Sequence, residues 1–128
     1  MKLLLDTHAA LWLFNEYEKL SSKARQYILA ETNELYISII SAWEVAIKTS
    51  LGKLGDFKGG AKALLSSVDN SPIELLPVTS EQVILVETLP FIHRDPFDRL
   101  LIATALSKNM SIVTVDDNIR KYSVSVLW

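Results

Sequence analysis

Short apolar runs alternate along this chain with longer segments whose apolar residues recur at helical spacing. The runs at 2–6, 34–38, 73–76, 111–115 and 124–127 have the length and composition of buried strands. The segments between them predict helices over 8–15, 21–31, 41–51, 61–68, 79–89 and 95–109, with a helical turn over 117–121. Strands that alternate with helices indicate an α/β fold, in which helices cover both faces of a parallel sheet.

Polar residues and glycine at the expected helix boundaries agree with this pattern. Thr7 is placed to cap the first helix, Ser21 and Ser22 the second, and Gly52 ends the third. No repeat, low-complexity segment or linker interrupts the series. We therefore expect a single domain over residues 1–128, which is a common size for one domain.

The composition is that of an ordinary globular protein, with 49% hydrophobic and 22% charged residues. The lack of cysteine excludes disulfides and thiolate metal sites. Asp6 and His8 interrupt the apolar start of the chain, and no apolar stretch approaches the roughly 20 residues that cross a membrane. We therefore expect a cytosolic protein without a membrane partner.

The net charge of −2 at pH 7 limits how this chain could bind nucleic acid. Proteins that hold nucleic acid by electrostatics alone are usually basic. If this protein acts on nucleic acid, something must offset the repulsion between its carboxylates and phosphate, and a bound divalent cation would do that locally.

Acidic residues from distant parts of the sequence are predicted to meet at one edge of the sheet. Asp6 ends the first strand, and Asp116 follows the fourth. Glu44 and Asp98 stand on the first turns of two helices. In open α/β sheets, ligands bind beyond the carboxyl ends of the strands. These four acids are therefore the candidate catalytic and metal-binding residues.

The chemistry of such a cluster points to a cation. Close carboxylates repel one another and raise each other's pKa, and a divalent cation removes that repulsion. Mg²⁺ and Mn²⁺ prefer oxygen ligands. They lower the pKa of water and polarise phosphoryl oxygens, which suits the hydrolysis of a phosphodiester.

The acids near residue 95 also have a structural interpretation. Asp95 is a good N-cap residue, and Pro96 suits the first helical position. Asp98 in the same turn would favour the helix dipole. Capping alone could therefore explain both aspartates.

The other acids have structural interpretations too. Glu44 and Lys48 have the i,i+4 spacing of a surface ion pair, although Glu44 lies in a mostly apolar stretch. Asp6 suits a strand end or a cap, and Asp116 and Asp117 suit a turn. We favour Asp116 for the site because it directly follows the predicted strand.

Several neighbouring residues are secondary candidates for the same site: Asp95, Asp117 and Thr7. Some cations are candidates for contacts to phosphate, although most such charges are simply solvated: Lys48, Arg94 and Arg99. His8 fits a structural histidine better than a metal ligand, whereas His93, in a predicted loop, stays undecided.

Four segments of the chain carry a resemblance to a known family. They are LLLDTHAALW (3–12), SAWEVAIKTSLGKL (41–54), HRDPFDRLLIATAL (93–106) and VTVDDNI (113–119). Taken together and in this order, they resemble PIN-domain proteins of the VapC toxin type over nearly the whole chain. The four acidic positions of that family fall on Asp6, Glu44, Asp98 and Asp116, so none is missing.

The resemblance implies a three-layer α/β/α sandwich with a central parallel sheet, often as a homodimer. It also implies that the acidic quartet binds Mg²⁺ or Mn²⁺ and cleaves single-stranded RNA. Toxins of this type are usually held inactive by a small antitoxin protein, which commonly inserts a basic or aromatic segment near the acidic site. Asp95 is an extra acid typical of the HRDPFDR form, and its role is undefined.

Two other functions remain open. The acidic pocket could be a binding module that docks a basic partner peptide without catalysis, and a metal-dependence assay would separate the two. An aspartate at the end of the first strand could also be the nucleophile of a phosphatase or phosphotransferase. That chemistry usually needs a second acid two residues later, where this chain has His8.

Overall fold

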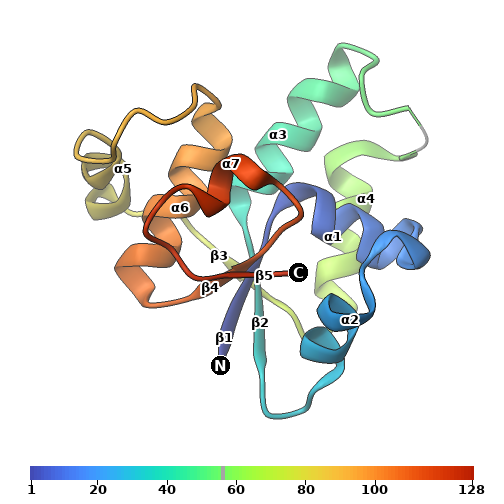
Figure 1. Ribbon diagram of the computed structural model, residues 1–128. Coiled ribbons are helices and arrows are strands. Elements are labelled where there is room, and N and C mark those ends of the chain that lie inside the picture. The colour runs from blue at the N-terminus through green and yellow to red at the C-terminus, as the bar shows by residue number, and fades with distance from the viewer. Residues whose placement is uncertain (56) are drawn as a thin grey trace.

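A parallel sheet forms the centre of the protein, as seen in the computed structural model, which describes residues 1–55 and 57–128. Its five strands stand in the order β3-β2-β1-β4-β5, and all neighbouring strands are parallel. Their bounds are β1 Lys2–Leu5, β2 Glu34–Ser38, β3 Glu74–Leu76, β4 Ser111–Val113 and β5 Val126–Leu127. All strands therefore end at the same edge of the sheet, and Figure 1 shows β1 rising toward the upper side of the molecule, where α1 begins.

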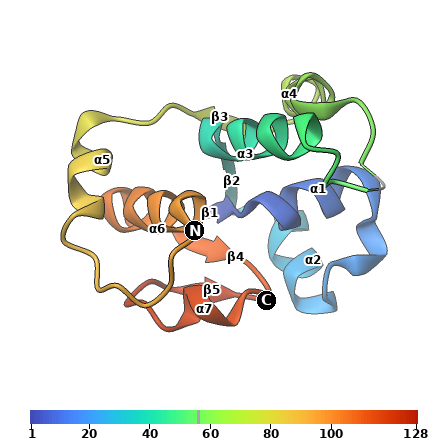
Figure 2. The same ribbon diagram turned by 90° about the horizontal axis from the view of Figure 1, so that it is seen from above.

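Helices cover both faces of this sheet. Figure 2 shows α1, α2 and α4 on one side, and α5 and α6 on the other. The bounds are α1 Thr7–Asn15, α2 Ser22–Leu29, α3 Ile39–Ser50, α4 Gly60–Asp69, α5 Ser80–Val86, α6 Pro96–Lys108 and α7 Asp117–Arg120. A short 3₁₀ helix, Tyr17–Lys19, follows α1 and was not predicted. The arrangement confirms the predicted α/β/α sandwich with a parallel sheet.

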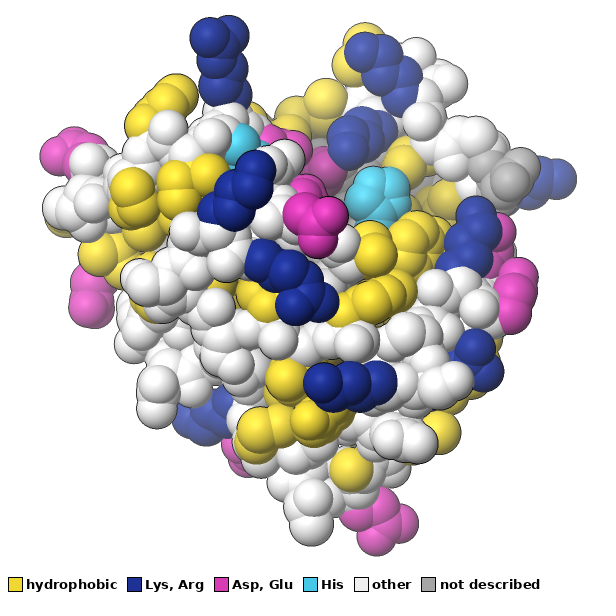
Figure 3. All heavy atoms as spheres, viewed as in Figure 1, with side chains coloured by type: hydrophobic (Ala, Val, Ile, Leu, Met, Phe, Trp, Pro, Cys, Tyr) yellow, Lys and Arg dark blue, Asp and Glu magenta, His cyan; other side chains and the backbone are white. Residues whose placement is uncertain are grey.

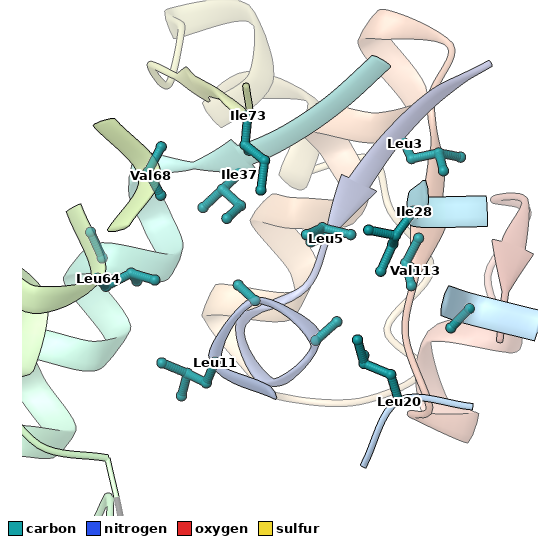
Figure 4. Close-up of a cluster of buried hydrophobic side chains, with 14 of the residues drawn as sticks. Leu3, Leu5, Leu11, Leu20, Ile28, Ile37, Leu64, Val68, Ile73 and Val113 are labelled. Carbon is teal, nitrogen blue, oxygen red and sulfur yellow. The ribbon is translucent and has the colours of Figure 1, made fainter. Parts of the chain in front are cut away.

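The three leucines of β1 contribute to two separate cores because successive strand residues point to opposite faces. Leu3 and Leu5 pack in the core on the side of α1 and α2, which Figure 4 shows. Leu4 packs in the core beneath α6. All three are fully buried, and burying one leucine side chain stabilises the fold by about 1.5–3 kcal/mol. The central strand is therefore apolar on both faces.

The starts of two helices differ from the prediction. Asp6, not Thr7, caps α1, because its Oδ1 accepts a hydrogen bond from the Ala9 N–H at 2.8 Å. Ser38 caps α3 by accepting from the Ile40 N–H, so this helix begins at Ile39, earlier than the predicted residue 41. The predicted cap at Ser21 is confirmed for α2.

β4 and β5 are each two residues shorter than predicted, and β1 and β3 are each one residue shorter. β4 ends at Val113 rather than at residue 115, so Asp116 follows the strand after two further residues. The Thr114 hydroxyl accepts the Asp116 N–H at 3.0 Å, which turns the chain from the strand into α7. β5 begins at Val126 rather than at residue 124.

None of the described helices is long and apolar enough to cross a membrane.

Candidate active site

The strand order reverses beside β1, and the candidate site lies at that point. The chain adds β2 and β3 on one side of β1, and β4 and β5 on the other. Beyond the carboxyl ends of β1 and β4 lies a cavity lined by Asp6, Thr7, His8, Trp12, Glu44, Lys48, Asp95, Asp98, Val115 and Asp116. Figure 3 shows acidic side chains in the hollow on this upper side of the molecule, with Lys and Arg side chains around it. The four acids predicted to meet at this edge do line one cavity.

Asp6 is held by two hydrogen bonds, one to each carboxylate oxygen. Besides the Ala9 N–H at Oδ1, the Thr114 hydroxyl donates to Oδ2. The side chain is buried, with an exposed fraction of 5%. Asp6 is thus both a helix cap and an acid of the cavity.

Glu44 is also fixed by its neighbours. The Thr7 hydroxyl donates to Oε1 at 2.6 Å, and Lys48 pairs with Oε2 at 2.5 Å. The Thr7 hydroxyl oxygen also lies 3.0 Å from Ser41 Oγ. The i,i+4 pair of Glu44 and Lys48 therefore forms as the spacing indicated, but Glu44 is buried and faces the cavity rather than the surface.

Asp98 lies in the first turn of α6, where Asp95 caps the helix. Oδ1 of Asp95 accepts the N–H groups of Phe97 at 2.9 Å and Asp98 at 3.2 Å. The Asp98 carboxylate itself is left for other contacts, and its Oδ2 lies 3.2 Å from Nε2 of His93. The capping interpretation is therefore confirmed for Asp95, while Asp98 faces the cavity.

Asp116 is the fourth acid of the cavity and stands at the start of α7. It caps α7 by accepting the Asn118 N–H at 2.8 Å. The next residue, Asp117, has a side chain that is 93% exposed, and it lies 3.9 Å from Arg120. Of these two neighbouring acids, Asp116 lines the cavity and Asp117 points to solvent.

Burial and like charge raise the pKa of two carboxyls. Burial raises the pKa of Asp6 to about 6, although the hydrogen bonds from Thr114 and Ala9 act in the opposite direction. The pKa of Asp98 rises to about 8. Burial is the largest cause there, and the other causes are the negative charges of Asp95, Asp6, Asp116 and Glu44. Negative charge is therefore crowded in this cavity, beyond what Lys48 offsets.

The donor set of the cavity fits a hard divalent cation. Lys48 brings one positive charge, which is already paired with Glu44. Most of the other polar groups that line the cavity are carboxylates, whose oxygens Mg²⁺ and Mn²⁺ prefer as ligands. Across the described residues, no three acidic or histidine side chains stand in the arrangement of a ready-made metal site. Mg²⁺ is commonly bound through one or two carboxylates and several waters. The geometry fits that mode of binding rather than a closed protein cage.

One predicted phosphate contact lies elsewhere in the structure. Arg99 is buried, and its guanidinium donates to the carbonyls of Pro90 at 3.0 Å and Val86 at 3.1 Å and to the Tyr122 hydroxyl at 3.1 Å. It therefore ties the segment before α6 to the helix and is not placed to reach a phosphate. Arg94 is exposed in that segment.

Sequence reasoning missed Thr114, Ser41 and Tyr122. Thr114 contacts two of the acids, and a threonine two residues before Asp116 is the one local signal that pointed to it. Ser41 and Tyr122 carry no such signal, because their contacts depend on how α3 and the end of α7 pack.

The sequence matches the profile of the PIN domain over residues 3–124. Because this match spans nearly the whole chain, the protein belongs to the PIN-domain family. PIN domains are generally nucleases. A comparison with curated protein sequences gave no match.

Solved structures with low sequence identity share the fold. The structure of VapBC2 from Rickettsia felis bound to a promoter DNA fragment has a TM-score of 0.71 and 18% identity, and the match covers 98% of this chain and 97% of that chain. DNA-bound VapBC from Salmonella typhimurium gives a TM-score of 0.67, 18% identity, and coverage of 98% and 96%. The PIN domain endonuclease Utp24 gives a TM-score of 0.53, 18% identity, and coverage of 94% and 74%.

Proposed function

We propose that this protein is a metal-dependent endoribonuclease, and that Asp6, Glu44, Asp98 and Asp116 form its active site. The observation that carries the proposal is the convergence of these four acids, from four separate segments, on one cavity at the reversal point of a PIN-domain sheet. Membership of a nuclease family supports the class of reaction.

The reaction forms a bond from water oxygen to phosphorus and breaks one phosphorus–oxygen ester bond. Mg²⁺ or Mn²⁺, when bound, lowers the pKa of water and stabilises the charge that develops on the phosphoryl oxygens. Asp98 and Asp6 are our first choices for direct ligands. Glu44 and Asp116 bind through water or orient the attacking water.

Hydrogen bonds within the site indicate which acids bind the cation directly and which act indirectly. Both oxygens of Glu44 are engaged, by Thr7 and Lys48, so this acid is best suited to an indirect role. Asp98 lies in the cavity and has the largest rise in pKa, which a cation would reverse. Thr7 acts by holding Glu44, and Lys48 is shared between Glu44 and an incoming phosphate.

A second hollow next to the active site suits an RNA strand. It shares His8 and Trp12 with the acidic cavity, and its other lining residues are Leu11, Asn15, Glu16, Lys19, Lys53, Leu54, Gly55 and Phe57. Aromatic side chains stack with unpaired bases, and lysines contact the backbone of a single strand. We therefore propose single-stranded RNA as the substrate, running from the acids past Trp12 toward Lys53.

We also propose that the protein is the toxin of a pair and is inhibited by an antitoxin protein. Two structures that share its fold are described as VapBC complexes. The acidic cavity is complementary in charge to a basic segment of such a partner. Exposed apolar side chains on α3, on α5 and in the loop after α5 support a homodimer: Ile39, Trp43, Val83, Ile84, Phe91 and Ile92.

Cleavage of a labelled RNA panel by the purified protein tests the proposal. Reactions with Mg²⁺, Mn²⁺ or EDTA are compared, and DNA strands of the same sequences serve as controls. The proposal predicts cutting of RNA that requires the metal. A folded protein that binds a basic peptide but cuts no strand with any metal would favour the non-catalytic binding module.

A further inference from the structure

A series of hydrogen bonds leads from Arg99 to the carboxylate of Asp98. Nη1 of Arg99 donates to the Tyr122 hydroxyl at 3.1 Å. That hydroxyl lies 3.0 Å from Nδ1 of His93, and the rings of Tyr122 and His93 are in edge-to-face contact. On the other side of the ring, Nε2 lies 3.2 Å from Oδ2 of Asp98. The group thus connects α6 with the segments before α6 and after α7.

The proton positions follow from what the Tyr122 hydroxyl can accept. A hydroxyl has one proton and two lone pairs. Arg99 Nη1 and the backbone N–H of His93, at 3.2 Å, both donate to this oxygen and fill its lone pairs. The hydroxyl proton is left for Nδ1 of His93. The ring proton of His93 is then on Nε2, where it donates to Asp98.

The start of this series is rigid. Arg99 is buried, with an exposed fraction of 7%. Its guanidinium donates to the backbone carbonyls of Val86 and Pro90, and its Cζ lies 4.8 Å from the centre of the Phe91 ring. An arginine stays protonated in proteins, so it remains a donor to Tyr122. The orientation of the Tyr122 hydroxyl is therefore set by the fold.

We propose that His93 and Tyr122 are positioning residues for Asp98, an inference that rests on the proposed metal-dependent nuclease. The Nε2–H of His93 holds Oδ2 of Asp98. Among the described residues, Oδ1 of Asp98 has no hydrogen-bond donor, and this side chain lines the cavity. The relay from Arg99 through Tyr122 and His93 thus turns one carboxylate oxygen toward the site of the cation.

The tautomer matters for this role. A histidine that donates from Nε2 while Nδ1 accepts a proton carries no net charge, so it orients Asp98 without cancelling its negative charge. Hydrogen bonds to a ligating carboxylate are a common way in which proteins set ligand direction, and removing such a partner typically weakens metal binding by about 10–100-fold. His93 acts on the cation through Asp98 and does not line the cavity itself.

The tautomer is measured directly by long-range ¹H–¹⁵N NMR of the histidine rings in metal-free protein. The chain has two histidines, and His93→Gln identifies which signals belong to His93. We expect the pattern of an Nε2-protonated ring in the wild type. Tyr122→Phe should shift the Nδ1 resonance, which loses its hydrogen bond, whereas Tyr36→Phe should leave it unchanged, because Tyr36 is a buried tyrosine of the same core without a contact to His93. An Nδ1-protonated ring in the wild type, or an unchanged Nδ1 resonance in Tyr122→Phe, overturns the relay.

Mn²⁺ affinity, followed by the paramagnetic resonance of the free ion, tests the effect on the site. His93→Ala should weaken binding by about 10–100-fold. His93→Gln, whose amide can still donate to Asp98, should lose less. Equal affinity of His93→Ala and the wild type overturns the positioning role. A wild type with the expected tautomer that binds no Mn²⁺ contradicts the proposed nuclease and leaves the hydrogen-bond relay supported.

Discussion

The Thr114 hydroxyl donates to Oδ2 of Asp6, and it joins the ends of the two strands at which the sheet order reverses. The same hydroxyl accepts the N–H of Asp116 at 3.0 Å. One side chain therefore sets the relative position of two of the four acids. Because Asp6 is buried, this donor also limits the rise in its pKa.

Thr114→Val keeps the shape of the side chain and removes this hydroxyl. Oδ2 of Asp6 is then buried without its donor, so the free energy of unfolding should fall by about 1–3 kcal/mol. Urea denaturation at neutral pH measures the change. Thr49→Val is the matched control, because Thr49 is exposed on α3 and should change stability little. Equal stability of Thr114→Val and the wild type would show that Asp6 does not depend on this hydrogen bond.

The raised pKa values predict how the stability of the metal-free protein depends on pH. Asp98 has a pKa of about 8 in the fold, against an ordinary value of 3.8, so the folded state binds its proton more tightly than the unfolded chain. Its contribution to stability is complete below pH 3.8 and is lost as the pH rises through about 8. Asp6 acts in the same direction, with a pKa of about 6.

Thermal denaturation in EDTA at several pH values tests this dependence. The melting temperature should fall from about pH 4 to pH 6 as both carboxyls lose their protons, and it should fall further up to about pH 8 through Asp98 alone. Mg²⁺ or Mn²⁺ should raise the melting temperature more at pH 8 than at pH 6, since the cation stabilises the charged carboxylates. A metal effect that does not grow with pH would contradict the proposed site.

Asp98→Asn removes the carboxylate whose charged form the fold destabilises, as its raised pKa indicates. The amide keeps the size of the side chain and can still accept a hydrogen bond from His93. The metal-free variant should therefore melt about 5 °C or more above the wild type at alkaline pH. The difference should shrink at low pH, where Asp98 is protonated in the wild type. A lower melting temperature at alkaline pH would mean that Asp98 stabilises the fold and is not strained by its neighbours.

Arg99→Lys tests whether this residue holds the fold or binds RNA. Lysine keeps the charge but cannot match the contacts that the guanidinium makes to Pro90 and Val86 together with Tyr122. The free energy of unfolding should fall by about 1–3 kcal/mol. The exposed Arg94 provides the control, and Arg94→Lys should leave stability unchanged. A stable Arg99→Lys protein with weakened RNA binding would restore Arg99 as a phosphate contact.

The order of strands and helices was predictable because burial on both faces makes parallel strands continuously apolar. Leu3, Leu4 and Leu5 are an example, since they fill two cores and only Lys2, at the exposed start of β1, is polar. The convergence of Asp6 and Glu44 was predictable for a related reason: parallel strands all end at one edge, and the residues that follow them lie close together.

Contacts that depend on packing were not predictable. The bond between His93 and Tyr122 joins residues 29 positions apart, and no local pattern relates them. Arg99 was predicted to contact phosphate because arginine is usually a surface charge. Its side chain instead points from α6 to the loop before the helix. Thr7 was taken for a cap because the end of β1 was placed one residue too late.

RNA cleavage by Asp98→Asn beside Asp117→Asn tests the central claim most directly. The two aspartates undergo the same substitution, but Asp98 lines the cavity and the side chain of Asp117 is 93% exposed. With Mg²⁺ or Mn²⁺ present, and with circular dichroism confirming that both variants are folded, Asp98→Asn should lose cleavage and Asp117→Asn should keep it. Full metal-dependent cleavage by folded Asp98→Asn would contradict the assignment of the active site to this acidic cavity.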